Sequence, residues 1–128
     1  MKKHILIIDD EENIRTLLCH FLNGVGYRAT PAASQAAALE VVRLDPPDLI
    51  ISDLQLEDAD GLEMIARLKT TLPDIPVILL TGVLFDPKAV NEVLLSKVTC
   101  YLPKTCTLAK ISEAVFRLAP RVSSASSA

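Results

Sequence analysis

The run Ile5-Leu6-Ile7-Ile8 is apolar at every position, and two later runs, Leu49–Ile51 and Val77–Leu80, share this property. A strand with one solvated face alternates apolar and polar residues, so runs without alternation are typical of strands buried on both faces. A parallel sheet covered by helices on each side buries its strands in this way. These three runs therefore predict the central strands of an α/β domain.

Two weaker strand patterns, Tyr27–Thr30 and Thr99–Leu102, complete a set of five strands. Segments with the apolar spacing of a helix follow each strand. Pro and Gly mark several of their ends. The expected helices are the stripe Ile14–Leu22 before Gly24, Ser34–Leu44, Gly61–Leu72, a helix opening at Asp86 and Pro87, and the stripe Leu108–Leu118 before Pro120. This alternation predicts a doubly wound (βα)5 domain.

The chain length fits a single domain. Its 128 residues, half of them hydrophobic, lie in the range of roughly 100–150 residues that is typical of one domain. The last eight residues, Arg-Val-Ser-Ser-Ala-Ser-Ser-Ala, show no period and offer little to bury. We therefore expect a domain over residues 1–120 and a disordered tail, or the start of a linker, over residues 121–128.

Composition excludes several classes of function. With 16 acidic and 13 basic residues and a net charge of −3, the chain lacks the positive charge that a phosphate backbone attracts, so direct nucleic-acid binding is not expected. No apolar run approaches the roughly 20 residues of a membrane span. The cysteines, Cys19, Cys100 and Cys106, lack CxxC spacing, which argues against zinc and disulfides and favours a reducing cytoplasm.

Chemically active side chains follow four of the expected strands. Asp9 and Asp10 end the first, Asp53 the third and Thr81 the fourth, and the fifth runs into Lys104. The ligand site of an open α/β sheet lies beyond the carboxyl ends of its strands. We therefore expect three carboxylates, a hydroxyl and an ammonium group to converge on one edge of the sheet.

This set of groups fits phosphoryl transfer. Three carboxylates in one place repel each other unless a cation is bound, and Mg²⁺ suits a site with one or two carboxylates and several waters. A hydroxyl and a lysine suit the oxygens of a phosphoryl group, whose transfer depends on positioning and charge neutralisation. Asp53, which ends the central strand and precedes a loop, is the best candidate for a nucleophile that forms an aspartyl phosphate.

These residues resemble a known family, the receiver domain of two-component response regulators. The resemblance covers about residues 3–119 and has four parts in a fixed order. They are Ile5-Leu-Ile-Ile-Asp-Asp-Glu11, Asp48-Leu-Ile-Ile-Ser-Asp-Leu54 followed by Asp60-Gly61, Pro76-Val-Ile-Leu-Leu-Thr-Gly82, and Tyr101-Leu-Pro-Lys104.

The resemblance implies a role for each matching residue. Asp53 is the implied phosphoacceptor, and Asp10, Asp53 and the main-chain carbonyl of Gln55 are the implied Mg²⁺ ligands, with Asp9 acting mainly through a coordinated water. Lys104 is expected to pair with phosphoryl oxygens. Thr81 is the implied switch hydroxyl, and Tyr101 the switch aromatic that turns inward when Thr81 moves.

The resemblance also implies an architecture and partners. The family's sheet order is 2-1-3-4-5. The implied donor is the phosphohistidine of a sensor histidine kinase or a phosphotransfer protein, and the domain is a signalling module rather than an enzyme, located in the cytoplasm. Phosphorylation is expected to switch the face formed by the fourth helix, fifth strand and fifth helix. That face would regulate an effector or form a homodimer.

One departure from the family pattern concerns the conserved lysine. Most receivers join a proline to it through a cis bond, whereas here Thr105 follows Lys104 and Pro103 precedes it. A cis bond before Thr105 would cost roughly 2.5–4 kcal/mol, so we expect a trans bond and a reshaped loop. If the loop moves Lys104 away, the chain would instead be a degenerate receiver that acts as a constitutive interaction module.

Two further hypotheses concern other parts of the chain. The loop residues Leu84 and Phe85 are more apolar than an exposed turn requires, which suggests a partner or dimer surface. A small flavodoxin-like enzyme that binds a nucleotide phosphate is a third functional class. It requires amide donors after the first strand, where this chain places Asp-Asp-Glu-Glu, whose charges repel phosphate.

Overall fold

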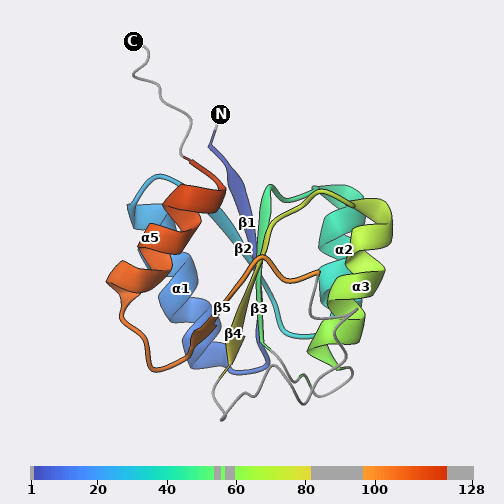
Figure 1. Ribbon diagram of the computed structural model, residues 1–128, viewed down its shortest axis with the longest axis horizontal. Coiled ribbons are helices and arrows are strands. Elements are labelled where there is room, and N and C mark those ends of the chain that lie inside the picture. Colours follow the sequence, from blue (N-terminus) through green and yellow to red (C-terminus); the bar gives the residue numbers. More distant parts are fainter. Residues whose placement is uncertain (1, 54–55, 57–59, 82–96, 121–128) are drawn as a thin grey trace.

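A five-stranded parallel sheet forms the centre of the molecule in the computed structural model, which describes residues 2–53, 56, 60–81 and 97–120. The strand order is β2-β1-β3-β4-β5, which confirms the predicted order (Figure 1). The strands are β1 (His4–Ile8), β2 (Arg28–Ala32), β3 (Leu49–Asp53), β4 (Val77–Thr81) and β5 (Cys100–Pro103).

Helices cover both faces of the sheet, so the domain has three layers. In Figure 1, α1 (Glu12–Gly24) and α5 (Leu108–Leu118) lie on one side, and α2 (Gln35–Leu44) and α3 (Gly61–Thr71) lie on the other. The helix expected from Asp86 onward and the apolar loop residues Leu84 and Phe85 lie outside the described residues.

Side-chain caps fix where three of the helices begin. Ser34 accepts a hydrogen bond from the amide of Ala37 at the start of α2. Asp60 and Thr107 do the same at the starts of α3 and α5. Each cap satisfies amide groups that have no partner within the helix. The second helix therefore begins at Gln35, one residue later than predicted, because Ser34 is its cap.

The central strands feed two apolar clusters, one on each face of the sheet. Leu6, Ile50 and Leu79 pack on the side of α2 and α3, whereas their neighbours Ile7 and Ile51 pack on the side of α1 and α5. Successive strand residues point to opposite faces, so a strand with helices on both sides requires apolar residues throughout. This confirms the reason that was inferred for the apolar runs.

The second strand differs from its predicted range of Tyr27–Thr30. It runs from Arg28 to Ala32, and Arg28 lies opposite His4 in β1. Tyr27 is a fully buried core residue before the strand. Its hydroxyl donates a hydrogen bond to the carbonyl of Ala119 at 2.7 Å, beyond the end of α5. The aromatic side chain was therefore a core signal rather than a strand signal.

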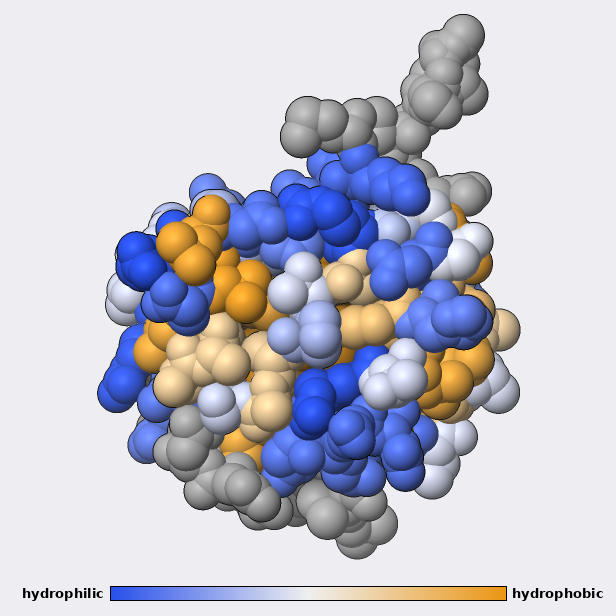
Figure 2. Space-filling view, turned by 180° about the vertical axis from the view of Figure 1, so that it is seen from behind, coloured by the Kyte–Doolittle hydropathy of each residue, from blue (hydrophilic) through white to orange (hydrophobic). Residues whose placement is uncertain are grey.

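The back of the molecule shows hydrophilic residues interspersed with apolar groups, the largest of which lies on the side of α2 and α3 (Figure 2). Exposed large apolar side chains in the described part of the chain are Leu17, Leu44, Tyr101 and Phe116. Scattered exposure of this kind is normal for a folded domain. Among the described residues, no helix combines the length and apolar character needed to cross a membrane.

We predict that Tyr27→Phe lowers the free energy of unfolding by about 1–2 kcal/mol, because the buried Ala119 carbonyl loses its hydroxyl donor. Urea denaturation measures the change. Tyr101→Phe is the matched control: the residue is 47% exposed, so water can solvate any group that loses the hydroxyl and stability should change less. Equal effects of the two substitutions would contradict the role given to Tyr27.

Candidate functional site

The carboxyl ends of the parallel strands bring the predicted residues to one edge of the sheet. Asp53 and Thr81 are the last residues of β3 and β4, and Asp9 and Lys104 directly follow β1 and β5. Asp9, Asp53 and Thr81 are buried, with 2%, 8% and 5% of their surface exposed, whereas Asp10 is exposed. The edge therefore holds two buried carboxylates close to an ammonium group.

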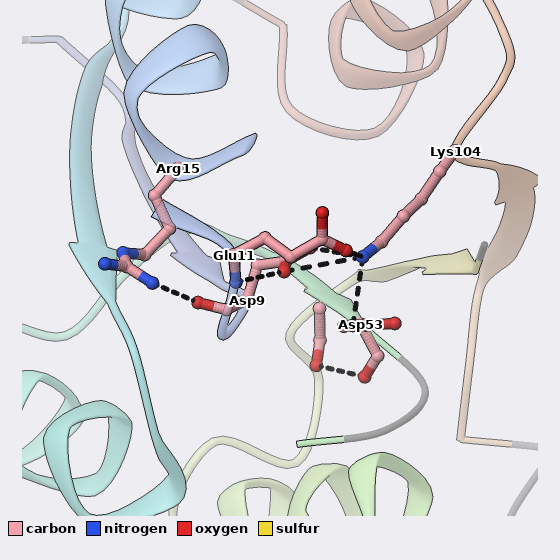
Figure 3. A network of polar contacts seen from close by, with 6 residues as sticks. Asp9, Glu11, Arg15, Asp53 and Lys104 are labelled. Carbon is pink, nitrogen blue, oxygen red and sulfur yellow. Dashed lines mark hydrogen bonds and ion pairs between the residues drawn. The ribbon is translucent and has the colours of Figure 1, made fainter. Parts of the chain in front are cut away.

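Lys104 forms the centre of the site. Its Nζ lies 3.1 Å from Asp9 Oδ2, 3.1 Å from Asp53 Oδ2 and 2.8 Å from Glu11 Oε1 (Figure 3). Its main-chain amide donates to the carbonyl of Thr81 at 2.7 Å. The described residues contain no cis peptide bond, which confirms the expected trans bond before Thr105. The unusual loop therefore leaves Lys104 within reach of Asp53.

Both the main chain and the side chain of Asp9 are held in place. Its amide donates to the carbonyl of Ala32, and Arg15 Nη1 donates to its carbonyl at 2.8 Å. The amide of Glu11 donates to Asp9 Oδ1 at 2.8 Å. These bonds fix the turn between β1 and α1, so Asp9 faces Asp53 and Lys104 in a defined orientation (Figure 3).

Burial and charge act in opposite directions on the titrating groups. Burial raises the pKa of Asp9 above its usual value, with a further contribution from Asp53, although the Glu11 amide and Lys104 act to lower it. Burial acts to lower the pKa of Lys104, but the carboxylates of Glu11, Asp53 and Asp9 outweigh it and raise this pKa. Lys104 therefore remains a cation at neutral pH and balances the buried acids.

The three aspartates also form a set of oxygen donors. Carboxylate oxygens of Asp9, Asp10 and Asp53 all lie within 4.8 Å of one another. Oxygen donors of this type are the ligands that Mg²⁺ prefers, and the exposed position of Asp10 leaves room for the waters that this ion retains. The donor set therefore fits Mg²⁺. The expected fourth contributor, the main-chain carbonyl of Gln55, lies outside the described residues.

Tyr101 is the predicted site residue that lies apart from the carboxylates. It pairs with Leu79 in the middle of the ladder between β4 and β5, and 47% of the residue's surface is exposed. The structure brings four of the predicted residues together as expected, namely Asp9, Asp10, Asp53 and Lys104. The main-chain carbonyl of Thr81 accepts a hydrogen bond from the Lys104 amide.

Two residues of the network, Glu11 and Arg15, were not identified from the sequence as parts of the site. Glu11 fitted the acidic first turn of a helix, which concealed its contact with Lys104. Glu11 lies two residues after Asp9, just beyond the strand end at which the site was expected. This position was the available signal. Arg15 lies one helical turn after Glu11, which was the corresponding signal for that residue.

Comparison with known proteins assigns the family, since the response regulator receiver domain matches residues 5–116. The chain belongs to this family. Sporulation initiation phosphotransferase F of Bacillus subtilis (strain 168) is 38% identical over 82 residues, which are 64% of this chain and 66% of that protein. The response regulator TrrA of Thermotoga maritima, solved in complex with Mg²⁺-BeF, superposes with a TM-score of 0.79 at 29% identity and covers 91% of this chain and 98% of that one.

Receiver domains also occur within longer proteins. The transcriptional regulatory protein GlrR of Escherichia coli (strain K12) is 37% identical over 79 residues, which are 62% of this receiver chain but 18% of GlrR. The receiver chain therefore spans less than two thirds of the length of the curated relatives named here. The family is a signalling family rather than a class of enzymes.

We predict that Asp9→Asn raises the melting temperature of the metal-free receiver by a few degrees at pH 7. The variant no longer buries a negative charge at position 9, and the cost of that burial is what raises the Asp9 pKa. Asparagine Oδ1 can still accept from the Glu11 amide. Thermal unfolding in the presence of a chelator measures the change. Asp10→Asn, which removes an exposed charge, is the matched control and should have a smaller effect.

The same cause fixes the pH dependence of this difference. A raised folded-state pKa means that the folded protein binds a proton that the unfolded chain releases, so stability falls as pH rises from the usual Asp value of 3.8 through the raised value. The advantage of Asp9→Asn should therefore be complete at pH 7 and disappear near pH 3.8. A variant less stable than the wild type at pH 7 would contradict this account.

Proposed function

We propose that this receiver domain accepts a phosphoryl group on Asp53 from the phosphohistidine of a sensor histidine kinase or a phosphotransfer protein. The contact between Asp53 Oδ2 and Lys104 Nζ, at 3.1 Å, is the observation that supports this most directly. It brings a potential nucleophile and a cation together at the carboxyl edge of the sheet. The relative TrrA was solved in complex with Mg²⁺-BeF, which supports Mg²⁺ as the ion of this site.

Asp53 is better suited to act as the nucleophile than its neighbours. Both Asp9 carboxylate oxygens are engaged, since Oδ1 accepts from the Glu11 amide and Oδ2 contacts Lys104. Asp10 is exposed and lies outside the Lys104 contacts. Asp53 ends β3, and its Oδ2, but not its Oδ1, contacts Lys104. Its Oδ1 can therefore approach a phosphorus atom.

The proposed transfer requires little covalent chemistry from the domain. An oxygen of Asp53 forms a bond to phosphorus as the phosphorus–nitrogen bond of phosphohistidine breaks, and the imidazole nitrogen leaves with the electron pair. Lys104 binds a phosphoryl oxygen and neutralises part of its charge. Mg²⁺ held by Asp9, Asp10 and Asp53, with the Gln55 carbonyl, would supply further neutralisation when bound.

The added phosphoryl group provides the signal. It brings about −1.5 to −2 charges and new acceptor oxygens, to which Lys104 and the Thr81 hydroxyl are proposed to move. The bond between the Lys104 amide and the Thr81 carbonyl couples the ends of β4 and β5. Tyr101 then turns inward from its exposed position. This would alter the face formed by β5, α5 and the helix expected from Asp86 onward, and that face would regulate an effector or form a homodimer.

We place this function in residues 1–120 of a cytoplasmic protein, with residues 121–128 as a tail or linker. The alternative, a degenerate receiver, was motivated by the departure at Thr105. Because Lys104 contacts both buried aspartates in spite of that departure, the motive for the alternative is weakened.

We predict that the protein gains the mass of one phosphoryl group when it is incubated with Mg²⁺ and acetyl phosphate. Intact-protein mass spectrometry should detect this gain in the wild type and not in Asp53→Asn, because an amide cannot form the acyl phosphate. Omission of Mg²⁺ should reduce the gain strongly.

Asp74→Asn is the matched control, since Asp74 is exposed and lies between α3 and β4 at the opposite edge of the sheet. It should be labelled like the wild type. A wild type that takes up no phosphoryl group would favour the constitutive interaction module, and undiminished labelling of Asp53→Asn would exclude Asp53 as the acceptor.

A further inference from the structure

Within the part of the chain that the structure describes, Lys104 Nζ contacts three carboxylates, and its contact with Glu11, at 2.8 Å, is the shortest. The Glu11 side chain is 59% exposed, whereas those of Asp9 and Asp53 are 3% and 11% exposed. The Lys104 side chain itself is only 12% exposed. Glu11 therefore contacts the ammonium at the solvent side of the site, and the two aspartates contact it from within.

The local structure does not require the Glu11 side chain for another purpose. Glu11 occupies the N-cap position of α1, but its side chain makes no capping hydrogen bond. Its main chain supports the turn instead, because its amide donates to Asp9 and its carbonyl accepts from Ile14 and Arg15. The carboxylate is thus free of the usual N-cap role and is directed at Lys104 (Figure 3).

Glu11 is also outside the donor set that fits Mg²⁺. That set consists of Asp9, Asp10 and Asp53, and two of its members now contact Lys104. A cation that binds these oxygens competes with the ammonium for them and repels it. Glu11 can keep an anionic partner on Lys104 while Asp9 and Asp53 turn toward the metal ion.

We propose that Glu11 is a positioning residue that holds the Lys104 ammonium at the solvent side of the site and thereby allows Mg²⁺ and Lys104 to occupy the site together. This inference rests on the Mg²⁺ site proposed above and assigns a role to a residue outside that site's ligands. Glu11 acts through Lys104, so its effect on metal affinity disappears when Lys104 carries no charge.

The test compares Glu11→Gln with Glu12→Gln in the full chain. Both variants remove one negative charge from exposed neighbouring positions, but Glu12 is not a carboxylate partner of Lys104. Mg²⁺ titration followed by amide NMR shifts of residues 9–11 and 53 gives the dissociation constants. We expect Glu11→Gln to weaken Mg²⁺ binding about three- to fivefold, and Glu12→Gln less than about twofold.

The same pair of variants in a Lys104→Met background distinguishes positioning from a direct charge effect. Without the ammonium, Glu11→Gln and Glu12→Gln should change the Mg²⁺ dissociation constant equally. A Glu11→Gln effect that persists in full in this background would overturn the inference, because Glu11 would then act directly on the metal ion. Melting temperatures and amide spectra of all variants show that each is folded.

The outcomes separate this inference from the proposed function. Equal Mg²⁺ affinity of Glu11→Gln and Glu12→Gln with Lys104 present would overturn the role of Glu11 and leave the metal site intact. A wild type that binds no Mg²⁺ at millimolar concentration would overturn both. Labelling by acetyl phosphate that is abolished in Asp53→Asn, together with equal affinities, would confirm the function and reject only the positioning role.

Discussion

The functional edge of this receiver depends on the interaction of the Lys104 ammonium with the buried carboxylates of Asp9 and Asp53. Lys104 contacts carboxylates that follow or end β1 and β3, although it comes itself from the end of β5. Two carboxylates buried this closely repel each other unless a cation lies between them. Lys104 supplies that cation, since its Nζ lies 3.1 Å from both Asp9 Oδ2 and Asp53 Oδ2.

The parallel sheet explains why these groups meet. All five strands run in the same direction, so their carboxyl ends lie at the same edge, and β1, β3 and β4 lie next to one another in the order of the sheet. The sequence was sufficient to predict this part of the site, because a run such as Val77–Leu80 indicates a buried strand and the next residue, Thr81, then lies at its end. The third helix likewise begins at Gly61 as predicted, where Asp60 caps it.

Other features depend on contacts between distant parts of the chain, which periodicity does not reveal. Tyr27 was expected in a strand, but its hydroxyl bonds to Ala119, 92 residues away. The reach of Lys104 was uncertain from the sequence because Thr105 replaces the usual proline. Its contacts with Asp9, Glu11 and Asp53, which lie 95, 93 and 51 residues away, show where the ammonium is held. Side-chain direction rather than residue type decides such contacts.

The most direct test of the account is the chemical identity of the phosphorylated residue. Hydroxylamine converts an acyl phosphate into a stable hydroxamate, so peptide mass mapping after incubation with acetyl phosphate and Mg²⁺ locates the modified carboxyl group. The account predicts a hydroxamate on Asp53 alone. A hydroxamate on Asp9 or Asp10, or none on any aspartate, would contradict it.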